Sequence, residues 1–285
     1  MIIINKRPYY PSKRVDFYAS RVLKELEIKE PPVLYGSILE YFGIELDWIT
    51  PEDEEEFERR SHKKIEIPAI LIHRNNKPTV FVRKSDMRER RRLSIFHECG
   101  HFDIPWHCQN DYACDCSDVV TIHKQTDEKE AFEYARSIMF PPALFYEDIR
   151  NLPVSLETVE LLAKRYRASF AATANNYVTF VPAQCAIIYL QLNPEADATG
   201  CPFMVNYSIK SKTHEFHRYW RKGELISHHG ILENCFHYKE RLTGEIPAIV
   251  FGSSKTHVYI SEVRPYGNDQ ICVFLKIPNR QIRIF

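Results

Sequence analysis

Five consecutive residues, His97-Glu98-Cys99-Gly100-His101, carry side chains at a spacing suited to metal chemistry. On a helix, residues four apart share one face, so the two imidazoles can bind one Zn²⁺ ion while Glu98 lies beside the open position of the metal. Zinc lowers the pKa of a bound water toward neutrality, and a carboxylate can take the proton as that water attacks a carbonyl. The motif therefore predicts peptide-bond hydrolysis, with Glu98 as the catalytic residue.

The residues before the motif favour a helix that continues through it. Residues 84–96 contain neither Gly nor Pro, and Ser85 or Asp86 is placed to cap the first turn. Gly100 would let a neighbouring backbone come close. So short a motif also occurs by chance. The alternative to a metal site is therefore a pair of surface histidines on an ordinary helix, with Glu98 solvated.

A second predicted helix offers a third metal ligand. It covers residues 127–140 and is ended by the pair Pro141-Pro142. Helical spacing places Glu128 on one face with three apolar residues, Ala131, Ala135 and Ile138. A carboxylate on a buried face needs a partner, which a metal ion supplies. We therefore expect Glu128 to be the third ligand, with Glu130 as the fallback. The alternative for Glu128 is a helix-start charge favoured by the macrodipole.

Together these two segments resemble the ImmA/IrrE family of zinc metallopeptidases. The family pattern is a basic or hydrophobic run into H-E-x-G-H, matched at residues 92–101, followed by a helix of the form E-x-x-A-x-x-[FY]-A-x-x-[LIM]-[LM]-x-P. The second part is matched by Glu128, Ala131, Tyr134, Ala135, Ile138, Met139 and Pro141. Segments near residues 28–44 and 154–169 resemble other family elements, so the resemblance covers roughly residues 14–180.

The resemblance implies a peptidase domain that holds one catalytic Zn²⁺ on His97, His101 and Glu128. Members of this family cleave helix-turn-helix (XRE-type) repressors encoded beside them, and so switch on DNA-damage, mobile-element or anti-phage operons. We therefore expect such a repressor as the substrate, and single-stranded DNA or a small molecule as the activating signal. The rival hypothesis is a non-catalytic, zinc-stabilised module that binds DNA or a repressor. An intact Glu98 argues against it, because a purely structural zinc needs no such carboxylate.

The loop after the motif departs from the family pattern, since it carries Cys108, Cys114 and Cys116. Three interpretations stay open: free thiols, a separate structural zinc held by His107 and the three sulfurs, or an inhibitory switch. In the switch, one thiolate takes the fourth position of the catalytic zinc, for which it is a better ligand than water. Cys114 is the first candidate, before Cys116 and Cys108.

The composition limits the class of protein. The chain of 285 residues has room for two domains, each with its own core. Lys and Arg total 38 and Asp and Glu total 38, so strong nonspecific attraction to nucleic acid is not expected. No apolar run approaches membrane-spanning length, and eight cysteines without a secretory signal indicate reduced thiols. We expect a cytoplasmic protein that does not bind membranes.

The pattern of the chain changes near residue 181. Before it, we predict helices at residues 14–27 and 33–42 and a β-hairpin at residues 67–83. After it, strand-like segments predominate: 185–192, 203–209, 248–251, 257–263, 271–277 and 280–285. We therefore predict an α+β chain of two domains. Residues 1–180 would form the zincin-like peptidase domain, and residues 181–285 a smaller α+β sensory domain, which resembles the GAF-like second domain of longer family members in topology only.

Two segments could bind other macromolecules. The exposed edge of the predicted hairpin can take an extended substrate as one more strand, although it can equally be structural. Residues 210–222 interleave basic residues with Phe216, Tyr219 and Trp220, a composition found on surfaces that bind single-stranded nucleic acid. Glu215 and Glu224 dilute this charge, so we expect a solvated face over a hydrophobic core.

Overall fold

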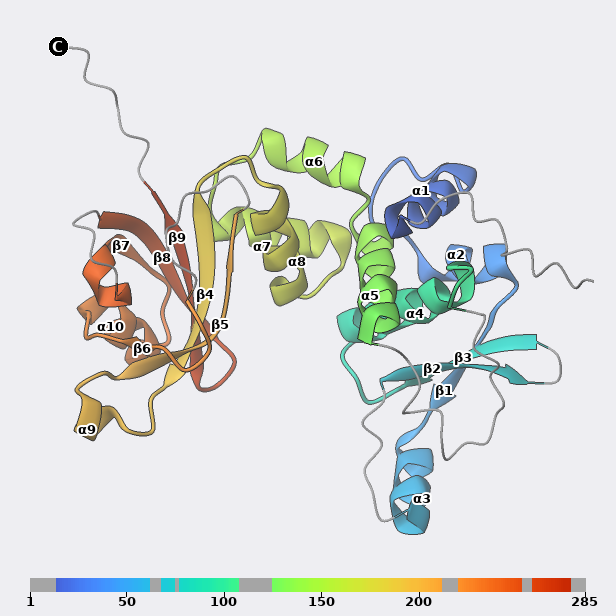
Figure 1. Cartoon of the computed structure of the whole chain (residues 1–285), viewed down its shortest axis with the longest axis horizontal. Coiled ribbons are helices and arrows are strands. Elements are labelled where there is room, and N and C mark those ends of the chain that lie inside the picture. Colours follow the sequence, from blue (N-terminus) through green and yellow to red (C-terminus); the bar gives the residue numbers. More distant parts are fainter. Residues whose placement is uncertain are drawn as a thin grey trace, which may run out of the picture. The chain divides into compact units, whose positions relative to one another are not determined.

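A computed structural model of the chain describes residues 14–61, 68–74, 77–107, 125–211, 220–252 and 258–277. The chain divides into two compact units (Figure 1). Unit 1 comprises Met1–Phe145 with Arg165–Ser169, and unit 2 comprises Tyr146–Lys164 with Phe170–Phe285. Both units mix helices with a sheet, in agreement with the predicted α+β class. Among the described helices, none has both the length and the apolar composition needed to cross a membrane.

Unit 1 combines helices with a small sheet. Its helices are α1 (Val15–Glu25), α2 (Tyr35–Phe42), α3 (Pro51–Ser61), α4 (Arg88–Asp103) and α5 (Gln125–Met139), and α6 (Pro142–Arg150) begins in it. Its strands are β1 (Glu45–Ile49), β2 (Ala69–Arg74) and β3 (Lys77–Arg83), in the order β1-β3-β2. Strand β1 runs parallel to β3 and β2 antiparallel to it. The predicted helices and the hairpin are confirmed.

The core of unit 1 forms where α4 and α5 pack together, with α1 against α5. Ile95 and Phe96 of α4 are fully buried, as are Ala131, Tyr134, Ala135 and Ile138 of α5. A Cβ atom at Gly100 would lie 3.1 Å from Cβ and Cδ1 of Tyr134. The glycine therefore makes room for a side chain of α5, whereas the sequence analysis expected a neighbouring backbone.

The N-terminus of α4 differs from the sequence expectation. The helix begins after Met87 with no side-chain cap. Ser85 Oγ donates instead to Glu54 Oε1 at 2.8 Å, and Asp86 pairs with Arg90 at 3.7 Å. The prediction that Ser85 or Asp86 caps α4 is therefore wrong, because both side chains have other partners.

A buried arginine fixes the position of α4. The Arg92 guanidinium donates to the carbonyl oxygens of Val33 and Tyr166, each at 2.8 Å, and to that of Arg167. Burial lowers the pKa of Arg92 to about 10. One side chain thus connects α4 to the residues before α2 and to Arg165–Ser169, the second segment of unit 1.

Unit 2 is built on a six-stranded antiparallel sheet in the order β6-β5-β4-β9-β8-β7 (Figure 1). The strands are β4 (Cys185–Leu192), β5 (Phe203–Lys210), β6 (Leu225–Ile226), β7 (Leu242–Pro247), β8 (Val258–Tyr266) and β9 (Gln270–Lys276). The helices are α7 (Leu156–Tyr166), which ends in unit 1, then α8 (Phe170–Phe180), α9 (Ala196–Thr199) and α10 (Gly230–Tyr238), with a 3-10 helix, η2, at Ala248–Phe251. Residues 248–251 were predicted as a strand, and that prediction is wrong.

Both faces of the central strands of unit 2 are covered. Ile188 and Val273 belong to the core cluster that contains Leu232 and Cys235 of α10. Side chains alternate along a strand, so Phe274 faces the opposite way, and its ring lies 6.5 Å from that of Tyr177 on α8. Helix α8 and most of α7 therefore belong to unit 2, although the sequence analysis placed residues 1–180 in the first domain. The face of β4 and β9 that points away from α10 must also be covered by apolar side chains, and α8 supplies them.

Candidate metal centre

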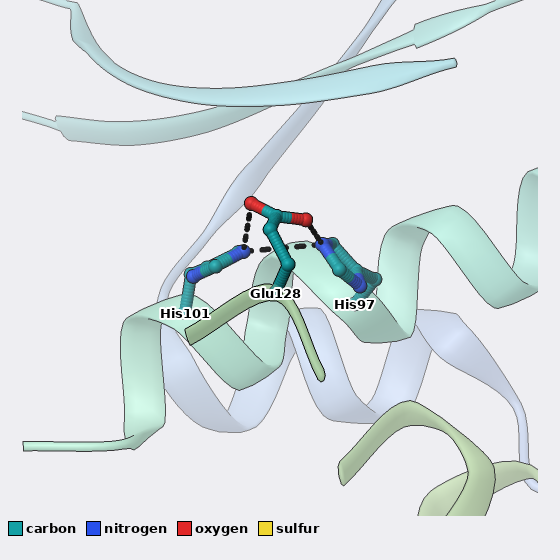
Figure 2. A group of neighbouring side chains, drawn as sticks. All are labelled: His97, His101 and Glu128. Atoms are coloured by element: carbon teal, nitrogen blue, oxygen red, sulfur yellow. Dashed lines mark hydrogen bonds and ion pairs between the residues drawn. The ribbon is translucent and has the colours of Figure 1, made fainter. Parts of the chain in front are cut away.

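Helices α4 and α5 bring the three predicted metal ligands together (Figure 2). Nε2 of His97 lies 3.1 Å from Nε2 of His101. One carboxylate oxygen of Glu128 lies 3.1 Å from His97 Nε2, and the other lies 3.4 Å from His101 Nε2. Glu128 comes from the first turn of α5, and the histidines lie one turn apart on α4.

These separations fit one tetrahedral zinc ion. With zinc–ligand bonds of about 2.0–2.1 Å, neighbouring ligand atoms lie about 3.4 Å apart. Both imidazoles are buried, whereas the Glu128 side chain retains 38 % of its exposure. Two histidines and one glutamate are a donor set of catalytic zinc sites, which keep a fourth position open. The residues present therefore fit a zinc ion that has one accessible side.

Without a metal, the electrostatics favour an ionised Glu128. Hydrogen bonds with His101, the larger contribution, and with His97 hold the pKa of Glu128 well below its usual range. The carboxylate is thus ready to coordinate a cation at neutral pH, since no proton has to be removed first.

Glu98 occupies a different environment on the same helix. Its Oε2 atom accepts a hydrogen bond from the Leu71 N–H of β2 at 3.0 Å. Desolvation raises the pKa of Glu98 to about 7, and the charge of His97 opposes this shift. A carboxyl group that titrates near neutrality can both take and return a proton at that pH, as general-base catalysis requires.

The strand that contacts Glu98 lies at one edge of the sheet of unit 1. The Pro68 carbonyl accepts from the Arg83 N–H at 3.0 Å, and the register then pairs residues 70, 72 and 74 with β3. The backbone groups of Ala69, Leu71 and His73 therefore point to the other edge. The Leu71 N–H belongs to that edge and reaches Glu98, so the edge of β2 lies beside the motif helix.

Glu130, the fallback ligand, and His107, one candidate for a separate structural zinc, contact each other. Glu130 accepts hydrogen bonds from Trp106 Nε1 at 2.6 Å and contacts His107 Nε2 at 3.0 Å. The other ring nitrogen of His107, Nδ1, lies 3.1 Å from Nδ1 of His101. A structural zinc on His107 would have to break these contacts. The sequence analysis missed this arrangement, because a lone histidine beyond the helix has no periodic signal.

Two other predictions concern the loop and the aromatic segment. Cys108, Cys114 and Cys116 lie outside the described residues, so the inhibitory-ligand hypothesis stays a prediction. Residues 212–219 also lie outside them. Trp220 is buried in the core of unit 2, and its indole N–H donates to the Phe251 carbonyl at 3.2 Å. This indole therefore offers no stacking surface to nucleic acid.

No family model and no curated protein matches the chain. A solved structure named "Mycobacterium tuberculosis transcriptional regulator" is similar to it, with a TM-score of 0.54 and 12 % sequence identity over 92 % of this chain and 87 % of that chain. At this identity the similarity concerns the fold alone.

Proposed function

We propose that the chain is a zinc-dependent endopeptidase. His97, His101 and Glu128 would hold one Zn²⁺ ion, and Glu98 would act as the general base. The observation that carries the proposal is that Nε2 of His97, Nε2 of His101 and the two carboxylate oxygens of Glu128 lie 3.1–3.4 Å apart, beside a carboxyl group whose pKa is raised toward neutrality. In this proposal unit 1 contains a zincin-like active site.

The chemistry assigns a distinct role to each side chain. When bound, Zn²⁺ supplies a Lewis acid that polarises the scissile carbonyl and lowers the pKa of water. Glu98 takes a proton from the attacking water as the new carbon–oxygen bond forms. Glu98 then gives this proton to the amide nitrogen as the carbon–nitrogen bond breaks. The hydrogen bond from the Leu71 N–H orients the carboxyl group for both transfers.

The outer edge of β2, which pairs with no other strand in the described part of the chain, suggests how a substrate is held. An extended segment can add to this edge and pair with the backbone groups of Ala69 and His73 and with the carbonyl of Leu71, whose N–H donates to Glu98. Because Leu71 also contacts Glu98, such pairing would place a peptide bond close to the catalytic carboxyl group. The substrate would then be an exposed, extended segment of a partner protein.

By the family resemblance, we propose that this partner is a helix-turn-helix repressor, and that its cleavage derepresses a stress, mobile-element or anti-phage operon. The similarity to a transcriptional regulator agrees with a role in transcription. In this proposal unit 2 is a GAF-like sensory domain that responds to single-stranded DNA or a small molecule. Cys114, before Cys116 and Cys108, would restrain the zinc, so a Cys114→Ser variant should cleave faster without an activator.

The decisive experiment compares repressor cleavage by wild type and by Glu98→Gln, with Glu133→Gln as the matched control on the exposed face of α5. Zinc content and the intact mass of the repressor are measured for each protein. We expect all three to bind zinc, and Glu98→Gln to lose cleavage by at least about 100-fold. Equal loss of intact repressor with wild type and with Glu98→Gln would refute the proposal that the chain is an endopeptidase. A wild type that binds zinc and repressor without cleavage would support the non-catalytic module instead.

A further inference from the structure

Two side chains, His107 and then Glu130, continue outward from the proposed metal ligand His101. Its Nδ1 atom lies 3.1 Å from Nδ1 of His107, and Nε2 of His107 lies 3.0 Å from Oε2 of Glu130. His101 and His107 retain only 4 % and 1 % of their exposure. We propose that Glu130 and His107 form a hydrogen-bond relay that positions His101 for metal binding. This inference rests on the proposed metal site and concerns positioning residues, which do not touch the substrate.

The direction of each hydrogen bond follows from the chemistry of imidazole. If His101 binds a metal through the lone pair of Nε2, its neutral ring carries the proton on Nδ1 and must donate it. His107 Nδ1 then accepts, so His107 carries its own proton on Nε2. That N–H donates to the Glu130 carboxylate, which can only accept. A single set of tautomers therefore satisfies every member of the relay.

The relay also disfavours the second neutral tautomer of His101. In the other tautomer of His101, the proton would lie on Nε2 and would block the metal. A ligand histidine commonly donates its second N–H to an acceptor that fixes its tautomer and ring orientation. Here that acceptor is a second histidine, which is itself fixed by a carboxylate from α5.

The two ligand histidines differ in this respect. Nδ1 of His97 is buried and has no hydrogen-bond partner among the described residues. The His97 ring packs instead against Phe132, with ring centroids 4.3 Å apart. The relay therefore acts on one of the two imidazoles, and its loss should disturb metal binding through His101.

The local backbone explains how residue 107 returns to the helix. Helix α4 ends at Asp103, and the Ile104 N–H still donates to the Gly100 carbonyl at 3.0 Å. The His107 N–H then donates to the Ile104 carbonyl at 3.0 Å, which closes a turn. Trp106 anchors this turn, because its ring packs edge-on against Tyr18 at 5.6 Å and its N–H donates to Glu130.

A second metal ion is the rival explanation of this cluster. Ligand atoms of His107, Asp127 and Glu130 all lie within 4.8 Å of one another. However, the Trp106 N–H donates at 2.6 Å to Oε2 of Glu130, the same oxygen that lies 3.0 Å from His107 Nε2. An oxygen that accepts from two donors has little capacity left for a cation. The relay predicts one metal ion per chain, and the rival predicts two.

The test measures zinc affinity by chelator competition, without any substrate, for wild type, His107→Ala, Glu130→Ala and Glu130→Gln. Glu133→Gln, exposed one turn along α5 from Glu130, is the control. We expect affinity to fall about 10- to 100-fold in both alanine variants. Glu130→Gln should lose less, because its amide oxygen still accepts from His107. The absorption spectrum of the Co²⁺-loaded protein should change in the alanine variants and stay unchanged in the control.

Two results separate this inference from the proposed function. A wild type that binds no zinc overturns both. If wild type binds zinc and the alanine variants have the same zinc affinity as Glu133→Gln, only the relay is overturned. The relay alone is also overturned if wild type holds two zinc ions and Glu130→Ala holds one. The nitrogen–proton correlation spectrum of the zinc-loaded wild-type imidazoles needs no substitution, so misfolded variants do not prevent the test. It should show His107 protonated at Nε2, and protonation at Nδ1 instead would refute the relay.

Discussion

Replacing Gly100 with alanine should weaken metal binding without unfolding the protein. The added Cβ atom would lie 3.1–3.2 Å from Cβ, Cδ1 and Cγ of Tyr134, closer than ordinary van der Waals contact. Because Tyr134 is fully buried, relief requires α4 and α5 to separate by a few tenths of an ångström. The proposed metal ligands come from these same two helices, and a metal site tolerates deviations of only about 0.2 Å.

The expected magnitudes follow from two opposing contributions. Alanine stabilises a helix by about 1 kcal/mol relative to glycine, whereas overpacking costs about 1–3 kcal/mol. The free energy of unfolding of the metal-free protein should therefore fall by at most about 2 kcal/mol. Zinc affinity should fall by at least about tenfold, because Glu128 moves away from His97 and His101.

The assay combines chelator competition for zinc with urea unfolding in the presence of a chelator. Gly36→Ala is the control, since nothing lies within 4 Å of the Cβ atom it would add. This control should unfold at the same or a higher urea concentration and bind zinc as wild type does. If Gly100→Ala binds zinc as tightly as Gly36→Ala, the coupling of helix packing to ligand geometry is refuted.

Three other predictions test the ligand set, the anchor of α4 and the buried thiols. Glu128→Ala should lower zinc affinity at least about 100-fold, as measured by chelator competition, because one of three ligands is lost; unchanged affinity would exclude Glu128 as a ligand. Arg92→Ala should lower the free energy of unfolding by about 3 kcal/mol or more, because three carbonyl oxygens lose their donor. The exposed Arg88→Ala control should change it by less than about 0.5 kcal/mol in urea unfolding. Burial raises the pKa of the Cys185 and Cys272 thiols to about 12, against about 8.5 in an unfolded chain. Above pH 8.5 the unfolded chain releases these protons and the folded chain retains them, so stability should fall by about 1.4 kcal/mol per pH unit for each thiol. Unfolding between about pH 8 and pH 10 measures this slope, and a slope unchanged by Cys272→Ala would contradict the assignment.

The sequence predicted the parts of the site that depend on local periodicity. The spacing of His97 and His101 determines that they share a face of α4, and the apolar pattern of α5 indicates which face carries Glu128. Both inferences need only the geometry of one helix. The position of Glu98 under the Leu71 N–H was not predicted, because it depends on how the hairpin packs on α4.

Two of the differences between prediction and structure depend on tertiary contacts. The partner of His107 is set by a turn after α4, which leaves no repeating pattern in the sequence. The domain boundary near residue 181 followed the change from helical to strand-like patterns, whereas β4 and β9 need a helix on each face. A strand buried on both faces is uniformly apolar, and its sequence does not say which helix covers it.

The proposed metal site and the core of unit 1 are parts of one interface between α4 and α5. Ala131 and Ala135 let the helices approach, Gly100 admits Tyr134, and Glu130 reaches His107 at the same interface. A metal that bridges His97, His101 and Glu128 would therefore bind only the packed arrangement of the two helices. By linkage, an ion present at about 100 times its dissociation constant stabilises that arrangement by about 2.7 kcal/mol. Any change that loosens the interface must then weaken metal binding, because the same free energy governs both.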